Sequence, residues 1–293
     1  MELRYNSLAG LVRAATESGR QISELVLADQ AKQMERDRKL LFQEMDRRLT
    51  VMDEAADEGV QPDLRSTSGL TGGSAYLLRI AADSGNTLCG GVFTRALARA
   101  LAVSELNAAM GRIVAAPTAG SCGILPAAVL TMLHDRGVAR HNCVMSLFTA
   151  SAVGMVIANN ACLAGAQGGC QAECGSASAM AAAALVELAG GSPQMASHAV
   201  AIALKNVLGL VCDPVAGLVE IPCIKRNESG IANAFTAAEL ALAGVASAIP
   251  ADEVIIAMKR IGDAMPAALR ETSEGGLAAT PTGRRLAAEL FGL

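Results

Sequence analysis

Four cysteines lie in one stretch of this chain, and each sits beside or close to a glycine or proline. The stretch spans residues 168–227, and its cysteines are Cys170, Cys174, Cys212 and Cys223. Glycine and proline shape turns and fix the direction of the backbone. For any one cysteine the simpler interpretation is a small buried hydrophobe. Four thiols held on turns favour a metal site, because thiolates are strong metal ligands.

The spacing of these cysteines separates two kinds of metal site. Zinc fingers and ribbons usually bring their ligands in close CxxC pairs, and the chain contains no such pair. Single cysteines on separate loops of a large fold suit an iron–sulfur cluster better. The spacing therefore favours a cluster, while buried structural thiols remain the alternative.

Several long motifs resemble the α chain of the iron–sulfur-dependent L-serine dehydratases. They are SGLTGG (68–73), APTAGSCGILPA (116–127), GGCQAE (168–173), CDPVAGLVEIPC (212–223), RNESGIANA (226–234) and MPAALRETSEGGLAATPTG (265–283). The resemblance covers most of the chain. It implies that Cys170, Cys212 and Cys223 hold a [4Fe–4S] cluster in which one iron has no protein ligand. Cys174 lies outside that set and is the spare candidate ligand.

The resemblance also implies a reaction, the elimination that converts L-serine to pyruvate and ammonia. The open iron would act as a Lewis acid on the β-hydroxyl while a base removes the α-proton. Two alternatives are a related iron–sulfur lyase acting on cysteine and a non-catalytic helical subunit that binds a cluster. A third is a pyridoxal-phosphate enzyme, which needs a Schiff-base lysine. Lys205 and Lys225 are near the cysteines in sequence, but neither lies in a recognisable cofactor motif.

A loop rich in glycine and small hydroxyls, RSTSGLTGGSA at residues 65–75, precedes an expected helix. Backbone N–H groups and hydroxyls at a helix N-terminus can bind an anion, although many ordinary loops share this composition. The resemblance implies that this loop holds the carboxylate of the substrate. The expected substrate-binding residues are Ser66, Ser68, Gly69, Thr71, Gly72, Gly73 and Asn227.

The catalytic base is not assigned by these motifs. His198 and Lys205 are weak candidates, seven residues apart and on roughly one face of an expected helix. Single-chain members of the family carry a further domain, whereas this chain ends in GRRLAAELFGL. We therefore expect the two-chain form, with a β chain as partner that contributes an active-site histidine, and an oligomeric assembly.

Composition narrows the functional classes further. The 293 residues are 52% hydrophobic and 18% charged, with a net charge of −4. No basic face is expected, so a nucleic-acid partner is disfavoured. The N-terminal residues lack the continuous apolar core of a signal peptide. Eight cysteines are therefore interpreted as thiols in a reducing cytoplasm, in an enzyme that acts on a small molecule.

The pattern of the chain predicts an all-α fold, because alternating Val, Ile and Thr are sparse. We expect one large catalytic domain, with a helical region at residues 1–64 and the cluster and substrate core at 65–293. The uncharged segment Asn142–Ala172 is rich in Ala, Gly and Ser, so it is interpreted as a central buried helix rather than a membrane span. Other expected helices cover residues 75–82, 85–112, 127–133, 177–189 and 197–210.

Overall fold

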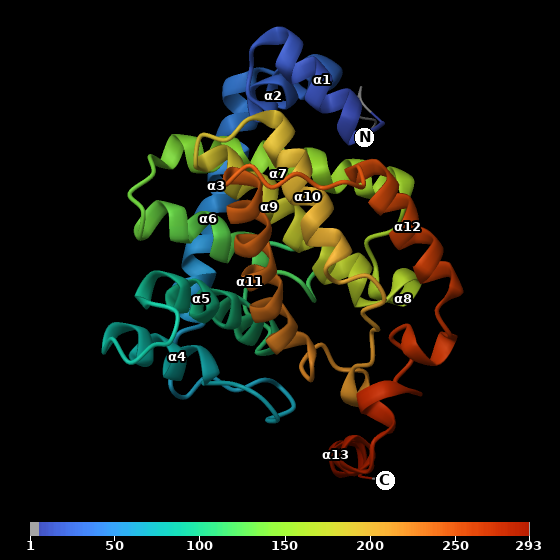
Figure 1. The fold of residues 1–293 in the computed structure, drawn as a ribbon. Helices are drawn as coiled ribbons and strands as arrows, with labels where there is room; N and C mark the ends of the chain where they lie inside the picture. The colour runs from blue at the N-terminus through green and yellow to red at the C-terminus, as the bar shows by residue number, and fades with distance from the viewer. Residues whose placement is uncertain (1–5, 293) are drawn as a thin grey trace.

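The computed structural model describes residues 6–292, which form a bundle of α-helices (Figure 1). The α-helices of this part of the chain are α1 (Leu8–Ser18), α2 (Ile22–Gln33), α3 (Arg38–Glu58), α4 (Ser74–Asp83), α5 (Gly91–Ala108), α6 (Ile124–His134), α7 (Arg140–Asn160), α8 (Gly165–Gly168), α9 (Ser176–Leu188), α10 (Pro193–Lys205), α11 (Cys223–Leu242), α12 (Ala251–Ala264) and α13 (Pro281–Phe291). Shorter turns are the π turn η1 (Gln171–Gly175) and the 3-10 turns η2 (Val215–Gly217), η3 (Ala267–Leu269) and η4 (Gly276–Ala279). The described residues contain no named strand, and an isolated bridge joins Cys212 to Arg270. The predicted all-α fold is confirmed.

Helix α9 lies at the centre of the bundle (Figure 1). Its residues from Ser176 to Val186 are all buried, and most are alanine. Alanine has the highest helix propensity, and its small side chain leaves room for neighbouring helices. Helices α6, α7, α10 and α11 accordingly all pack against α9. The expected alanine helix at 177–189 therefore agrees with α9 to within one residue at each end.

The prediction of one helix across Asn142–Ala172 is wrong in its extent. Helix α7 ends at Asn160, and residues 161–175 form a loop, α8 and η1. Gly169 has a φ of 76°, and a Cβ there would lie 2.7 Å from the Leu210 carbonyl oxygen, so the chain turns at this glycine. By length and composition α7 is apolar enough to cross a membrane, but 67% of its apolar window is buried inside the protein.

The N-terminal helices α1 to α3 belong to the same hydrophobic core as the rest of the bundle. Leu8, Leu11 and Leu49 are each at most 1% exposed within that core. Helix α3 ends at Glu58, and Gly59 is its C-cap residue. A Cβ on Gly59 would lie 2.1 Å from the Ala102 carbonyl oxygen. Glycine therefore allows the end of α3 to pack directly against α5.

Two further expected helices have different boundaries in the structure. The helix expected at 85–112 begins only at α5, because Gly90 takes a φ of 82° that no helix allows. The helix expected at 197–210 is α10, which begins and ends earlier. The Ser192 side chain accepts a hydrogen bond from the Met195 N–H at 3.2 Å, and Pro193 occupies the first helical position. This serine cap and proline together mark the start of α10.

Candidate functional site

The four cysteines of the 168–227 stretch come from three separate segments and are all buried. Cys170 immediately precedes the π turn η1, and Cys174 lies within it. Cys212 lies in the loop after α10, and Cys223 is the first residue of α11. π turns within helices are frequent at functional sites. Here the π turn leads directly into the central helix α9.

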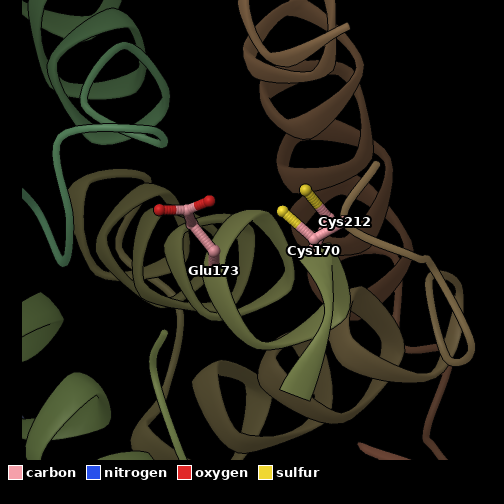
Figure 2. A group of neighbouring side chains, drawn as sticks. All are labelled: Cys170, Glu173 and Cys212. Atoms are coloured by element: carbon pink, nitrogen blue, oxygen red, sulfur yellow. The ribbon is translucent and has the colours of Figure 1, made fainter. Parts of the chain in front are cut away.

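Cys170, Cys212 and Glu173 form a compact group that could hold a metal ion. One ligand atom from each of the three lies within 4.8 Å of the others. Figure 2 shows the sulfur atoms of Cys170 and Cys212 side by side, with Glu173 on the adjoining turn. Cys223 is outside this compact group but is near enough to interact electrostatically with Cys170.

The surroundings of Cys170 favour a negative charge on its sulfur. Interactions with the neighbouring Cys174 and Cys212 thiols lower the pKa of Cys170 to about 3 despite its burial, and the Arg226 guanidinium lowers it as well. Interaction with Cys170, together with burial, raises the pKa of Cys174 and of Cys212. Burial raises the pKa of Cys223 to about 12. A soft cation would replace these thiol protons, so the donor set suits a thiophilic metal.

Glu173 is a residue of the site that the sequence analysis missed. The Thr118 hydroxyl donates a hydrogen bond to its carboxylate. Burial, together with the charges of Cys170 and Glu271, raises the pKa of Glu173 to about 7 against the lowering effect of that hydrogen bond. A Cβ on Gly120 would lie 2.7 Å from the Glu173 carboxylate, so glycine makes room for it. Glu173 lies one helical turn after Cys170, but that spacing alone does not single out a carboxylate as part of the site.

The Gly-rich loop is tied to the segment that leads to Cys223. Ser68 and Thr71 donate hydrogen bonds to the same carboxylate oxygen of Glu220, at 2.9 and 2.7 Å. The side chain of Ser66 lies 3.2 Å from the Ser68 hydroxyl and accepts from the Thr71 N–H at 3.3 Å. Glu220 is 5% exposed. The hydroxyls expected to bind a substrate carboxylate therefore already bind a carboxylate of the protein.

The helix N-terminus behind this loop also has an internal acidic partner. The N–H groups of Ser74 and Ala75, at the start of α4, donate to the Glu105 carboxylate at 2.9 and 3.1 Å. Gly73 precedes them with a φ of 78°. Gly72 has a φ of 132°, and a Cβ there would lie 2.1 Å from the Leu64 carbonyl oxygen. These glycines are required by backbone geometry, and Gly69, with a φ of 76°, turns the tip of the loop.

Asn227 joins α11 to the loop before α6 and is 1% exposed. Its Oδ1 accepts from the Gly123 N–H at 2.9 Å. Its Nδ2 donates to the carbonyl oxygens of Gly120 and Cys223, at 2.7 and 3.0 Å. Both amide protons are therefore engaged by the backbone, so Asn227 positions this loop beside Cys223.

His198 and Lys205, the weak candidates for the base, both contact Ser247 in the loop between α11 and α12. The Ser247 N–H donates to His198 Nδ1 at 3.2 Å, and Lys205 Nζ donates to the Ser247 hydroxyl at 3.1 Å. The structure thus brings the two residues together, but around Ser247 rather than around the cysteines. Lys225, the other lysine near the cysteines in sequence, is exposed.

The remaining cysteines have other surroundings. Cys122 and Cys143 are fully buried, and their thiols lie 3.8 and 3.9 Å from the carbonyl oxygens of Val103 and Val129. Burial raises the pKa of Cys122 to about 12 and that of Cys143 to about 11. Cys89 is exposed and Cys162 is half-buried.

Comparison with known proteins gives a consistent assignment. The profile of the family described as "Serine dehydratase alpha chain" matches residues 17–278. The "Probable L-serine dehydratase, alpha chain" of Bacillus subtilis (strain 168) is 50% identical over 288 residues, covering 98% of this chain and 96% of that protein. The "L-serine dehydratase, alpha chain" of Peptoniphilus asaccharolyticus is 44% identical, covering 96% of each chain.

A longer relative matches nearly as much of the chain. The "L-serine dehydratase" of Streptomyces coelicolor is 40% identical over 286 residues, covering 94% of this chain but 61% of that protein. The matches extend from the N-terminal helices to the C-terminal segment and include both the Gly-rich loop and the cysteines. The chain therefore belongs to the serine dehydratase alpha chain family.

Proposed function

We propose that this chain is the α chain of an L-serine dehydratase, an L-serine ammonia-lyase that forms pyruvate and ammonia. The compact group of Cys170, Glu173 and Cys212, with both cysteines buried, is the observation that carries the proposal. It lies within the residues that match the family profile. The names of the relatives from Bacillus subtilis and Peptoniphilus asaccharolyticus support the same reaction and substrate.

The thiols of this group suit an iron–sulfur cluster. Cys170 and Cys212 offer sulfur atoms within 4.8 Å of each other. Cys223 begins α11 and is close enough to Cys170 that the charge of Cys170 contributes to the raised pKa of Cys223. Thiolates are the ligands that such clusters take from proteins. Cys170, Cys212 and Cys223 would hold a [4Fe–4S] cluster, with Cys174 as a hydrogen-bond donor to Cys170. A bound cluster with one open iron supplies a Lewis acid for the β-hydroxyl of the substrate.

The Gly-rich loop would bind the substrate carboxylate. Ser68 and Thr71 present two hydroxyl donors, both engaged with Glu220 in this structure. A substrate carboxylate that takes these donors replaces Glu220 as their acceptor, with Ser66, Gly69, Gly72 and Gly73 shaping the loop. Asn227 would contribute indirectly, by hydrogen-bonding the backbone of Gly120 and Gly123 and so fixing the loop before α6.

A β chain is the proposed partner and the proposed source of the proton-accepting histidine. The two most similar full-length relatives described above are named as alpha chains. The Streptomyces coelicolor protein has a large portion beyond the part that this chain covers. His198 and Lys205 contact Ser247. We therefore assign these two residues a structural role and not the role of the base. We propose a cytoplasmic location, because the eight cysteines are free thiols and thiols persist in reducing compartments. We also propose an oligomer, because only 18% of the residues are charged.

Pyruvate formation from L-serine tests this proposal directly. The chain is purified without oxygen and assayed alone and with a β chain. We expect activity with the β chain that air abolishes and that Fe²⁺ with a thiol reductant restores. Hydroxylamine, which attacks the carbonyl chemistry of pyridoxal phosphate, should have no effect. Full activity of the isolated chain in iron-free, aerobic buffer would contradict both the cluster and the partner.

Two outcomes of the same experiment identify the rival functions. Faster turnover of L-cysteine than of L-serine would assign the chain to a cysteine lyase. Binding of iron and sulfide without turnover of either amino acid, even with the β chain, would assign a cluster-binding subunit.

A further inference from the structure

Arg226 lies on α11, three residues after Cys223, and its guanidinium reaches the segments of both other candidate ligands. We propose that Arg226 is the positioning residue of the three-cysteine site. It holds the segments of Cys170, Cys212 and Cys223 in one arrangement and directs an N–H at the Cys170 sulfur. The inference rests on the proposed function in so far as these cysteines bind the metal.

The hydrogen bonds of Arg226 connect all three segments. Its Nη1 donates to the Cys170 sulfur at 3.4 Å and to the Val211 carbonyl oxygen at 2.8 Å. Its Nη2 donates to the Asp213 carboxylate at 2.7 Å. Val211 and Asp213 are the two neighbours of Cys212 in the chain. One guanidinium therefore binds the residue on each side of Cys212 and also contacts the Cys170 sulfur.

Asp213 is itself held in place from the other side. Its second carboxylate oxygen accepts from the Leu277 N–H at 2.7 Å. A Cβ on Gly276 would lie 2.3 Å from this carboxylate, so glycine at that position makes room for Asp213. The side chains of Arg226 and Asp213 are 15% and 4% exposed. A buried pair with both partners hydrogen-bonded in this way fixes geometry, and breaking it leaves a charge uncompensated.

The three contacts of Arg226 depend on the planar geometry of its guanidinium as well as on its charge. A guanidinium is a planar fork with donors in fixed directions, whereas an ammonium is a compact charge on a flexible stem. Lysine at position 226 would keep the charge but lose the simultaneous contacts with Asp213, Val211 and Cys170. Hydrogen bonds to the ligand sulfurs are among the factors that set the reduction potential of iron–sulfur clusters. Residues that orient the ligands of a metal also change its affinity by about 10- to 100-fold.

A buried arginine elsewhere in the fold supplies a matched control. Arg99 is 11% exposed and pairs with Asp135, which is 7% exposed, at 2.5 Å. It also donates to the Thr131 hydroxyl at 2.9 Å. This pair joins α5 to α6 and touches none of the candidate ligands. Arg226→Lys and Arg99→Lys therefore change the same kind of interaction in two different places.

The test uses the full chain, metal-free with Cd²⁺ as the probe and reconstituted with iron and sulfide in the presence of the β chain. We expect Arg226→Lys to weaken Cd²⁺ binding by about tenfold or more, measured by cadmium–thiolate absorption. The reconstituted variant should also release iron to a chelator faster and show a shifted reduction potential in an EPR-monitored titration. Arg99→Lys should match the unsubstituted chain in all three measurements.

Asp213→Asn provides a second variant if Arg226→Lys does not fold. Asp213→Asn keeps Arg226 but removes the negative charge that pairs with its guanidinium. It should therefore shift Cd²⁺ affinity, iron release and reduction potential in the same direction as Arg226→Lys. Cd²⁺ affinity and iron release equal to those of Arg99→Lys would overturn the inference. If the Cd²⁺ defect is present while no variant or parent turns over L-serine, Arg226 keeps its role and the proposed function fails. If L-serine is turned over and Arg226→Lys behaves like Arg99→Lys, the proposed function stands and the role of Arg226 fails.

Discussion

Thr71 donates a 2.7 Å hydrogen bond to Glu220, a residue 149 positions later in the chain. Ser68 donates to the same oxygen at 2.9 Å. Glu220 is three residues before Cys223, so the loop expected to bind substrate is linked to the segment that carries a candidate metal ligand. A group that displaces Glu220 from these hydroxyls therefore changes the contacts of the Gly-rich loop and of the segment that leads to Cys223 at the same time.

Thr71→Val removes one of the two hydroxyl donors while keeping the shape of the side chain. A hydrogen bond to a charged group contributes about 1.5–3 kcal/mol. We therefore expect the KM for L-serine to rise at least about tenfold. The measurement is steady-state pyruvate formation by the reconstituted α and β chains.

Thr67→Val is the matched control, because Thr67 lies in the same loop but its side chain is exposed. Its KM should stay within about twofold of the unsubstituted enzyme, consistent with the small effects of most surface substitutions. Equal KM values for the two variants would show that the loop is only structural.

Serine substitutions separate metal ligands from structural thiols. Cys170→Ser, Cys212→Ser and Cys223→Ser should each lose iron and acid-labile sulfide after anaerobic reconstitution, because a hydroxyl is a poor substitute for a thiolate ligand. Cys89→Ser, Cys143→Ser and Cys162→Ser should retain both. Metal analysis and the visible absorption of the cluster give the measurement.

Cys174→Ser decides the role of the fourth thiol near the site. The Cys174 thiol interacts with Cys170 and lowers its pKa, and a serine hydroxyl at position 174 can still donate a proton to that sulfur. We expect this variant to keep its iron. Loss of iron from Cys174→Ser but not from Cys223→Ser would exchange their assignments, because Cys174 would then be a ligand.

Local sequence signals predicted much of the fold but only part of the site. The alanine-rich run at 177–189 located α9 to within one residue at each end, since helix propensity acts over a few residues. The expected 142–172 helix, by contrast, ends early at Asn160, because Ala161 leaves the helical backbone conformation with a φ of −142°.

The acidic residues of the site escaped prediction because their partners are distant in sequence. Glu173 is bound by Thr118, 55 residues away, and Glu105 caps α4 from a position 31 residues after Ser74. The pairing of Glu220 with the Gly-rich loop spans a still longer separation. Only the packed fold brings such groups together, so composition and spacing could identify the loop and the cysteines but not the carboxylates among them.

Asn227→Ala should lower the free energy of unfolding as well as any affinity for substrate. The substitution leaves the Gly123 N–H and the Gly120 carbonyl oxygen without the partners that Asn227 supplies. Each buried polar group left unpaired costs about 1–3 kcal/mol, so we expect a loss of about 2–4 kcal/mol in the free energy of unfolding, measured in urea. Asn233→Ala, on the same helix but only half-buried, should cost about 1 kcal/mol. A change in KM with unaltered stability would return Asn227 to direct substrate contact.

Glu187 gives the fold a pH dependence that lies away from the cysteines. Burial raises the pKa of Glu187, against hydrogen bonds from Ser23 and Thr149. In the unfolded chain the carboxyl loses its proton near its ordinary pKa of about 4.3. Between that pH and the raised pKa, the folded chain keeps a proton that the unfolded chain has lost. The contribution of Glu187 to the free energy of unfolding therefore falls as pH rises through this window.

Glu187→Gln removes this contribution because the amide does not titrate. The free energy of unfolding of the parent minus that of the variant should fall between about pH 4.3 and the raised pKa. Above the raised pKa the difference should be constant. Urea unfolding at closely spaced pH values provides the measurement. Glu239→Gln, which removes an exposed glutamate on α11, controls for the loss of one carboxyl. A parent-minus-variant difference that is flat across the window, or that rises with pH, would show that burial does not determine the protonation of Glu187.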